Sequence, residues 1–194
     1  MRYYLKILKC LPVFLVLAIV SGCVQKKPAE TNEYYDRGAE VVDATFSALS
    51  KQLQSALAEG GVKNAVEYCN FIVNPVIDSL SRQYNAEIRR VTLKTRNVLN
   101  KPRDYENIML RAYLDNKEEG RLLKPIVENL YDGNHVYYSP IIIKSGLCLA
   151  CHGEVGTNIT QKDYDYIRSL YPTDKATGYS EGDMRGVWAI VLYD

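Results

Sequence analysis

The chain has 194 residues, with 24 lysines and arginines against 23 aspartates and glutamates, so its formal net charge at pH 7 is +1. This near-neutral balance excludes the strongly basic surface of a nucleic-acid-binding protein, and the chain carries no polybasic run of the kind that binds anionic membranes. The length is sufficient for one domain with its own hydrophobic core.

The N-terminus has the layout of a secretory signal peptide. Basic residues precede an uncharged apolar run over residues 11–20, which is too short for a membrane span. The next stretch, Val20-Ser21-Gly22-Cys23, resembles the lipobox of bacterial lipoproteins, in which the chain is cleaved before the cysteine and the cysteine is acylated. We therefore predict a lipoprotein signal peptide at residues 1–22 and lipidation of Cys23. The alternative is an ordinary signal peptide with an incidental cysteine.

The residues after Cys23 predict how the protein is attached to the bacterial cell envelope. Residues 23–33 are polar and lack periodicity, which indicates a tether between the lipid and a domain at 34–194. Acylation with more than one chain gives stable membrane anchoring. Because Val24 is not the aspartate that usually retains lipoproteins at the inner membrane, we expect a periplasm-facing protein of the outer rather than the inner membrane.

The first part of the domain is predicted to form three helices, over residues 35–59, from 62 onward and over 75–83. Gly60-Gly61 ends the first helix. The second carries Cys69 on its apolar face and cannot run through Pro75, which lacks an amide donor. We therefore expect Asn74 and Pro75 to be the N-cap and first residue of the third helix.

The remainder of the domain is predicted to mix strands and helices. Asp132-Gly133 between two apolar runs is a strong hairpin signal. Since no repeated β-α-β units occur, we predict an α+β fold in which an antiparallel sheet carries its helices, the N-terminal ones included, on one side. The expected elements are strands at 88–94, 123–130, 135–143 and 187–193, a loop at 96–103, and helices at 104–119 and 163–170.

The sequence Cys148-Leu149-Ala150-Cys151-His152 is the pattern by which a c-type haem is attached covalently. Residues three and four apart lie on one face of a helical turn, so both thiols can reach one edge of a porphyrin while His152 turns toward the iron. The alternatives are half of a zinc site, a redox dithiol and a structural disulfide. A four-cysteine zinc site needs a second Cys-x-x-Cys, which the sequence lacks, and a dithiol does not require the histidine. Covalent haem c is assembled outside the cytoplasmic membrane, which agrees with an exported chain.

Counting thiols leaves one cysteine without a role. Of the five cysteines, Cys10 leaves with the signal peptide, Cys23 takes lipid, and Cys148 and Cys151 take haem. Cys69 remains unpaired in an oxidising compartment. It is either a buried small hydrophobe, the usual fate of a free cysteine, or a metal ligand, and counting does not choose between them.

Several segments together resemble PAS-like domains with a covalent c-type haem, which occur as exported single-domain bacterial proteins and as input modules of sensor kinases. The resemblance runs through most of the mature chain. One departure is Val98, where a proline is expected, and it affects local loop geometry. The matching segments are Glu67-Tyr68-Cys69-Asn70, Arg90 to Asn97 with Asn100 and Pro102, Tyr138-Ser139-Pro140-Ile141, Cys148 to Gly153, Tyr171-Pro172-x-Asp174-x-Ala176-x-Gly178-Tyr179 and Gly182-Asp183-x-Arg185-Gly186.

The resemblance implies one haem iron held by histidine on one side and cysteine on the other. By position, these metal ligands are His152 and Cys69. The competing ligands in the sequence are Met109, Met184 and His135.

The haem propionates also need cationic partners. We expect Arg96 or Arg185 to supply them, and the alternative for each is an ordinary salt bridge.

The expected ligand set indicates a function. A thiolate donor favours ferric iron and lowers the reduction potential, and reduction weakens its hold on the metal. We therefore expect a redox sensor, or a sensor of a gaseous ligand such as NO or CO, that signals through a separate protein partner. The alternative is a low-potential electron-transfer cytochrome of the periplasm. We expect no enzymatic activity, because a peroxidase needs an open distal site.

Overall fold

The computed structural model describes residues 29–193, so the predicted signal peptide, Cys23 and the start of the tether lie outside the described residues. Within that range, no helix combines the length and apolar character needed to cross a membrane. The elements are α1 (Ala29–Phe71), α2 (Val73–Gln83), β1 (Ala86–Val91), η1 (Val98–Asn100), α3 (Asp104–Glu118), β2 (Ile126–Asn129), β3 (His135–Ile142), α4 (Gly146–His152), α5 (Gln161–Leu170) and β4 (Met184–Leu192).

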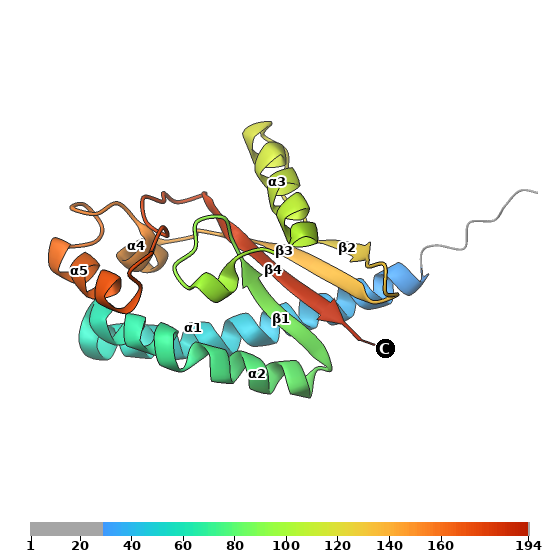
Figure 1. Cartoon of the computed structure of the whole chain (residues 1–194), viewed down its shortest axis with the longest axis horizontal. Helices are drawn as coiled ribbons and strands as arrows, with labels where there is room; N and C mark the ends of the chain where they lie inside the picture. The colour runs from blue at the N-terminus through green and yellow to red at the C-terminus, as the bar shows by residue number, and fades with distance from the viewer. Residues whose placement is uncertain (1–28, 194) are drawn as a thin grey trace, which may run out of the picture.

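The four strands form one antiparallel sheet in the order β1-β4-β3-β2 (Figure 1). The predicted hairpin between β2 and β3 is confirmed. The amide of Asn134 donates to Asp132 Oδ1 over 3.0 Å, and Gly133 has φ +88°, a conformation that glycine adopts without a steric cost. The α+β class is therefore correct.

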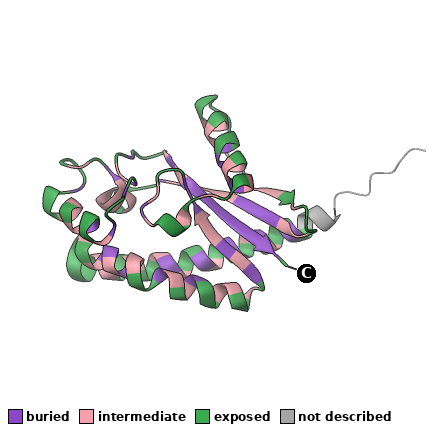
Figure 2. Cartoon of the chain, in the orientation of Figure 1, coloured by how far each residue is buried: buried purple, intermediate pink, exposed green. Residues whose placement is uncertain are grey.

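Helices cover both faces of the sheet, which corrects the prediction that they lie on one side. α1 and α2 pack on one face through a cluster that includes Ile88, Trp188 and Ile190. α3 packs on the opposite face, where Leu110 and Tyr113 meet the alternate residues of β4 (Figure 1). β4 is buried along nearly its whole length, as Figure 2 shows, because it lies at the centre of a sheet covered on both sides.

The helix predicted to end at Gly60-Gly61 does break there. Both glycines have non-helical backbone angles, and Gly61 has φ +65°, although the two halves are described together as α1. At the other end, α1 begins at Ala29, so residues 29–33 of the predicted tether are helical.

Several element boundaries differ from the predicted ones. α2 begins at Val73, and Pro75 lies inside its first turn rather than at its first position; a proline is tolerated there because the first backbone amides of a helix have no intrahelical partner. β1 ends at Val91, three residues earlier than predicted, where Thr92 turns away and its amide bonds the carbonyl of Asn100 over 3.1 Å. β2 is shorter than predicted, and β4 starts at Met184.

Candidate functional site

The segment Cys148 to His152, which the sequence predicts to attach haem, lies within the short helix α4. Cys148 and Cys151 lie one turn apart on this helix, both half-buried and both as free thiols. This is the one-sided arrangement that the spacing predicts. Cys151 also packs in a hydrophobic cluster with Val66 of α1 and Ile167 of α5. Through this cluster α4 contacts the second half of α1.

His152, the last residue of α4, has a fixed ring orientation. Its Nδ1 lies 2.7 Å from the carbonyl oxygen of Ala176. A carbonyl can only accept, so Nδ1 carries the proton and Nε2 keeps its lone pair, as a metal-binding imidazole requires. Burial, with smaller effects from Arg185 and Arg96, holds the pKa of His152 well below its ordinary value of 6.5, which keeps the ring neutral.

Arg96 holds the end of α4 in place. Its Nε and Nη2 donate to the two carboxylate oxygens of Asp174 over 3.1 and 3.2 Å, and Nη2 also donates to the carbonyl of Cys151 over 2.6 Å. The Asp174 side chain is fully buried. These contacts give Arg96 a positioning role within the protein, where the sequence suggested a propionate contact.

Cys69 lies on the last turn of α1 and packs against the cluster between α1, α2 and the sheet. Burial raises the pKa of its thiol, and the positive charges of Arg90 and Arg96 lower it in part. The same two arginines act on His152, and Cys69 and Cys151 also interact electrostatically. The structure therefore gathers Cys69 and α4 around one pair of guanidinium groups.

The competing ligands lie elsewhere. Met184 and Met109 pack in the cluster between the sheet and α3, on the face opposite to α1 and α2. His135 stacks on Tyr34, with ring centroids 3.6 Å apart, where β3 begins. This placement favours Cys69 among the ligands that the sequence offered.

Arg185 lies beside this site with unused hydrogen-bonding capacity. Its Nη1 donates to Thr92 Oγ1 over 2.9 Å and to the carbonyl of Lys94 over 3.1 Å, and its guanidinium lies 5.5 Å from the centre of the Tyr179 ring. Within residues 33–193, its buried Nε finds no hydrogen-bond partner. The residue as a whole is half-buried, and this burial lowers the pKa of its guanidinium.

Arg90 is a site residue that the sequence analysis missed. Its guanidinium lies 6.0 Å from the centre of the Trp188 ring, its Nε is likewise buried without a partner in the described part of the chain, and burial lowers its pKa. The only signal in the sequence is strand alternation, which places one of Arg89 and Arg90 on each face of the sheet. The structure decides between them, because Arg89 pairs with Glu106 of α3 over 2.7 Å and Arg90 therefore lies on the face covered by α1 and α2.

The charges around Cys69 and His152 are unbalanced. Arg90, Arg96 and Arg185 bring three guanidinium groups to the same region, and among the described residues the carboxylate that acts on them, Asp174, is paired with Arg96. A buried cation with an unpaired donor is costly unless an anion meets it. The arrangement is therefore suited to a bound group that carries negative charge.

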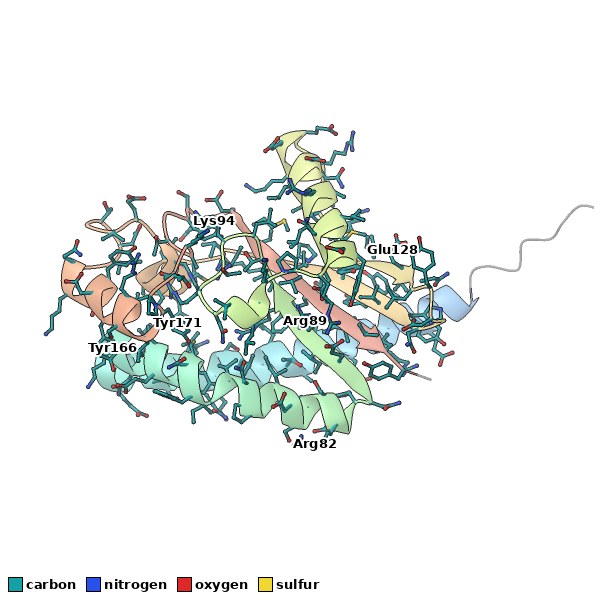
Figure 3. All side chains as sticks on the ribbon, in the orientation of Figure 1. Arg82, Arg89, Lys94, Glu128, Tyr166 and Tyr171 are labelled. Atoms are coloured by element: carbon teal, nitrogen blue, oxygen red, sulfur yellow. The ribbon has the colours of Figure 1, made fainter. Side chains whose placement is uncertain are left out.

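α5 packs beside the residues around Cys69 and His152. Tyr166 donates a short hydrogen bond to Glu67 of α1, and Figure 3 shows Tyr166 where α5 approaches that helix. Tyr171, at the end of α5, is buried in the same cluster as Cys151 and interacts electrostatically with Cys69 (Figure 3). α5 thus packs against both α1 and the α4 segment.

Comparison with known proteins places these features in a family. The sequence model of the Tll0287-like family matches residues 27–192. A solved structure described as the cyanobacterial haem protein Tll0287 is similar in fold, with a TM-score of 0.55 and 22% sequence identity over 78% of this chain and 91% of that chain. No curated protein matches significantly. Because the family model spans most of the sequence, this chain belongs to the Tll0287-like family.

Proposed function

We propose that this protein binds one haem covalently through Cys148 and Cys151, and that His152 and Cys69 are the two residues that would hold its iron. One observation carries the proposal: the hydrogen bond from His152 Nδ1 to Ala176 leaves Nε2 free on a neutral ring, at the end of the helix that carries both thiols. The similar solved structure is that of a haem protein, which supports the same conclusion. The four-stranded sheet with α1 and α2 on one face supports a PAS-like fold.

The arginines around the site fit this group. A haem has two propionate carboxylates, and the buried Nε atoms of Arg90 and Arg185 have no partner in the described chain. We infer that Arg90 and Arg185 bind the carboxylates, while Arg96 positions the last turn of α4.

We infer further that the protein is a redox sensor or a sensor of NO or CO. Bound haem supplies an iron that exchanges one electron and takes a diatomic ligand. The protein holds His152 and Cys69 differently, which supports Cys69 as the residue that a diatomic ligand would replace. His152 is fixed by Ala176 and by the Arg96 contact to Cys151, whereas Cys69 lies at the end of α1, where the chain turns into α2 at Ile72.

Attachment to the envelope completes the proposal. A lipid on Cys23 would hold the domain at the outer membrane facing the periplasm, where a redox or signalling partner would read its state. We infer no enzymatic activity, since Cys69 would occupy the position that a peroxidase keeps open.

The test begins with expression of the full chain in cells competent for cytochrome c maturation. We expect a Soret band, and haem staining that survives denaturing electrophoresis in the wild type and is lost in Cys148→Ala/Cys151→Ala. A colourless protein would contradict the haem assignment.

Absorption spectra of the reduced protein with and without CO then separate the two functions. A sensor shows a shifted Soret band on CO addition. An unchanged spectrum would overturn the sensing of a diatomic ligand and leave a purely redox role, either redox sensing or electron transfer.

A further inference from the structure

A pocket lies apart from the cysteines, beside the loop that follows β1. It has a volume of about 500 Å³ and is formed by that loop, the first half of α3 and the segment at 173–175. Most of its lining residues are exposed, so it is an open hollow whose volume is in the range of sites that hold small molecules. None of Cys69, Cys148, Cys151 and His152 is among the residues that form it.

The lining of this pocket combines positive charge with an apolar wall. Its lining includes the three cationic residues Lys101, Arg111 and Lys175 and one acidic residue, Asp104, which leaves an excess of two positive charges. Leu93, Val98 and Pro102 supply the apolar part. A small organic molecule with an acidic group matches this combination better than an inorganic ion does, because carbon atoms can cover the apolar wall while the acid meets the cations.

Polar groups that line the pocket have further capacity for hydrogen bonds. Asn107 lines it, and its buried Oδ1 has no partner in the described part of the chain. Rotation of this side-chain amide would present a donor or an acceptor to a ligand. Thr95 and Thr173 add two hydroxyl groups to the same lining.

The pocket adjoins the residue that orients His152, because Lys175 of the pocket lining is followed directly by Ala176. The amide of Lys175 donates to the carbonyl of Thr95 over 2.9 Å, which binds the two walls of the pocket together. The next residue, Ala176, is fully buried and accepts the hydrogen bond from His152 Nδ1. A molecule held by Lys175 would therefore act one residue away from the carbonyl that orients the histidine.

We propose that this pocket binds a small organic acid, either a carboxylic acid or a phosphate ester, and that its occupancy changes the environment of His152. The binding itself is independent of the function proposed above. The effect on His152 is read through the haem, and this second half rests on the proposed function.

Isothermal titration calorimetry of the purified full chain tests the binding. The probes are malate, glycerol 3-phosphate and inorganic phosphate, which distinguish a carboxylic acid, a phosphate ester and a bare anion. Saturable binding of malate or glycerol 3-phosphate, tighter than that of phosphate, is expected. If neither organic probe binds saturably, or if phosphate binds as tightly, the proposed ligand class is wrong.

Two matched double variants show whether the pocket is responsible. Lys175→Gln/Arg111→Gln removes two pocket cations and should weaken binding by about tenfold or more, since each charge-assisted hydrogen bond contributes on that scale. Lys51→Gln/Arg82→Gln makes the same change in charge at exposed positions on α1 and α2 and should bind as the wild type does. Equal loss in both variants would indicate nonspecific attraction and would overturn the pocket assignment.

The effect on His152 is measured in the same samples once they carry haem. Saturation with the organic probe should shift the Soret band or the electron paramagnetic resonance signal of the wild type and leave Lys175→Gln/Arg111→Gln unchanged. Binding without any spectral change would refute the coupling alone. Because the calorimetric result does not depend on haem, failure of the pocket and failure of the haem assignment remain distinguishable.

Discussion

Arg96 donates a 2.6 Å hydrogen bond to the carbonyl oxygen of Cys151, which joins the loop after β1 to the last turn of α4. The same guanidinium group donates hydrogen bonds to the fully buried carboxylate of Asp174. One side chain thus ties together three segments that lie far apart in the sequence. The orientation of His152 depends on this connection, because Ala176 follows Asp174 by two residues.

Replacing Arg96 with alanine should destabilise the protein strongly. The substitution leaves Asp174 buried and unpaired, and breaking a buried ion pair from one side costs about 3–5 kcal/mol. Urea unfolding of the variant measures this loss. Arg103→Ala is the control, because Arg103 and Glu87 form a partly exposed pair, 43% and 33% exposed, whose loss should cost about 1 kcal/mol or less. Similar losses in both variants would argue against the role given to Arg96.

The positive charge of Arg90 should affect the reduction potential of the proposed haem. Removing a cation from the neighbourhood of the iron stabilises the ferric state, so Arg90→Gln is expected to lower the reduction potential by roughly tens of millivolts. Potentiometric titration followed at the Soret band gives the value. Arg82→Gln, at an exposed position on α2, should leave the potential unchanged (Figure 3). A potential that Arg90→Gln does not move would remove Arg90 from the site.

Gly38 permits the close approach of α1 to β3. A Cβ atom at this position would overlap the side chain of Tyr137, which is itself buried. Although alanine favours helix by about 1 kcal/mol, overpacking costs about 1–3 kcal/mol, so Gly38→Ala should be destabilising overall. Thermal unfolding tests this against Gly146→Ala in α4, where a Cβ meets nothing within 4 Å. A stabilised Gly38→Ala would show that α1 can move away from the sheet.

The pair formed by Glu87 and Arg103 should make stability depend on pH in acid. Hydrogen bonding to Arg103 lowers the pKa of Glu87 below its ordinary value of 4.5, against the opposing effect of burial. A carboxyl group with a lowered pKa in the folded state adds stability above its ordinary pKa and loses it as the pH falls through the lowered one. Glu87→Gln should therefore be less stable than wild type at neutral pH and should approach it in acid. Equal stability at neutral pH would refute the assignment.

The fold was predictable where local chemistry dictates the backbone. Asp132-Gly133 predicted its hairpin and Gly60-Gly61 its helix break correctly. The number of covered sheet faces was predicted wrongly, even though the unbroken apolar run from Val187 to Leu192 fits a strand that is buried on both faces.

Some residues of the candidate site could likewise be predicted from the sequence, and others could not. The Cys-x-x-Cys-His spacing predicted the helical turn that α4 provides, and the resemblance suggested Cys69. The partner of Arg96 could not be predicted, because Asp174 is 78 residues away and only the folded chain brings the two together. Arg90 was missed because a strand arginine resembles a surface residue until the opposite face of the strand is known to be occupied by Arg89 and Glu106.

Electron paramagnetic resonance of the ferric protein tests the central claim most directly, namely that a covalently attached haem is held between His152 and Cys69. The wild type should give a low-spin signal typical of thiolate ligation. Cys69→Ala should lose that signal, while Met109→Leu should keep it. An identical spectrum in the wild type and in Cys69→Ala would contradict the claim.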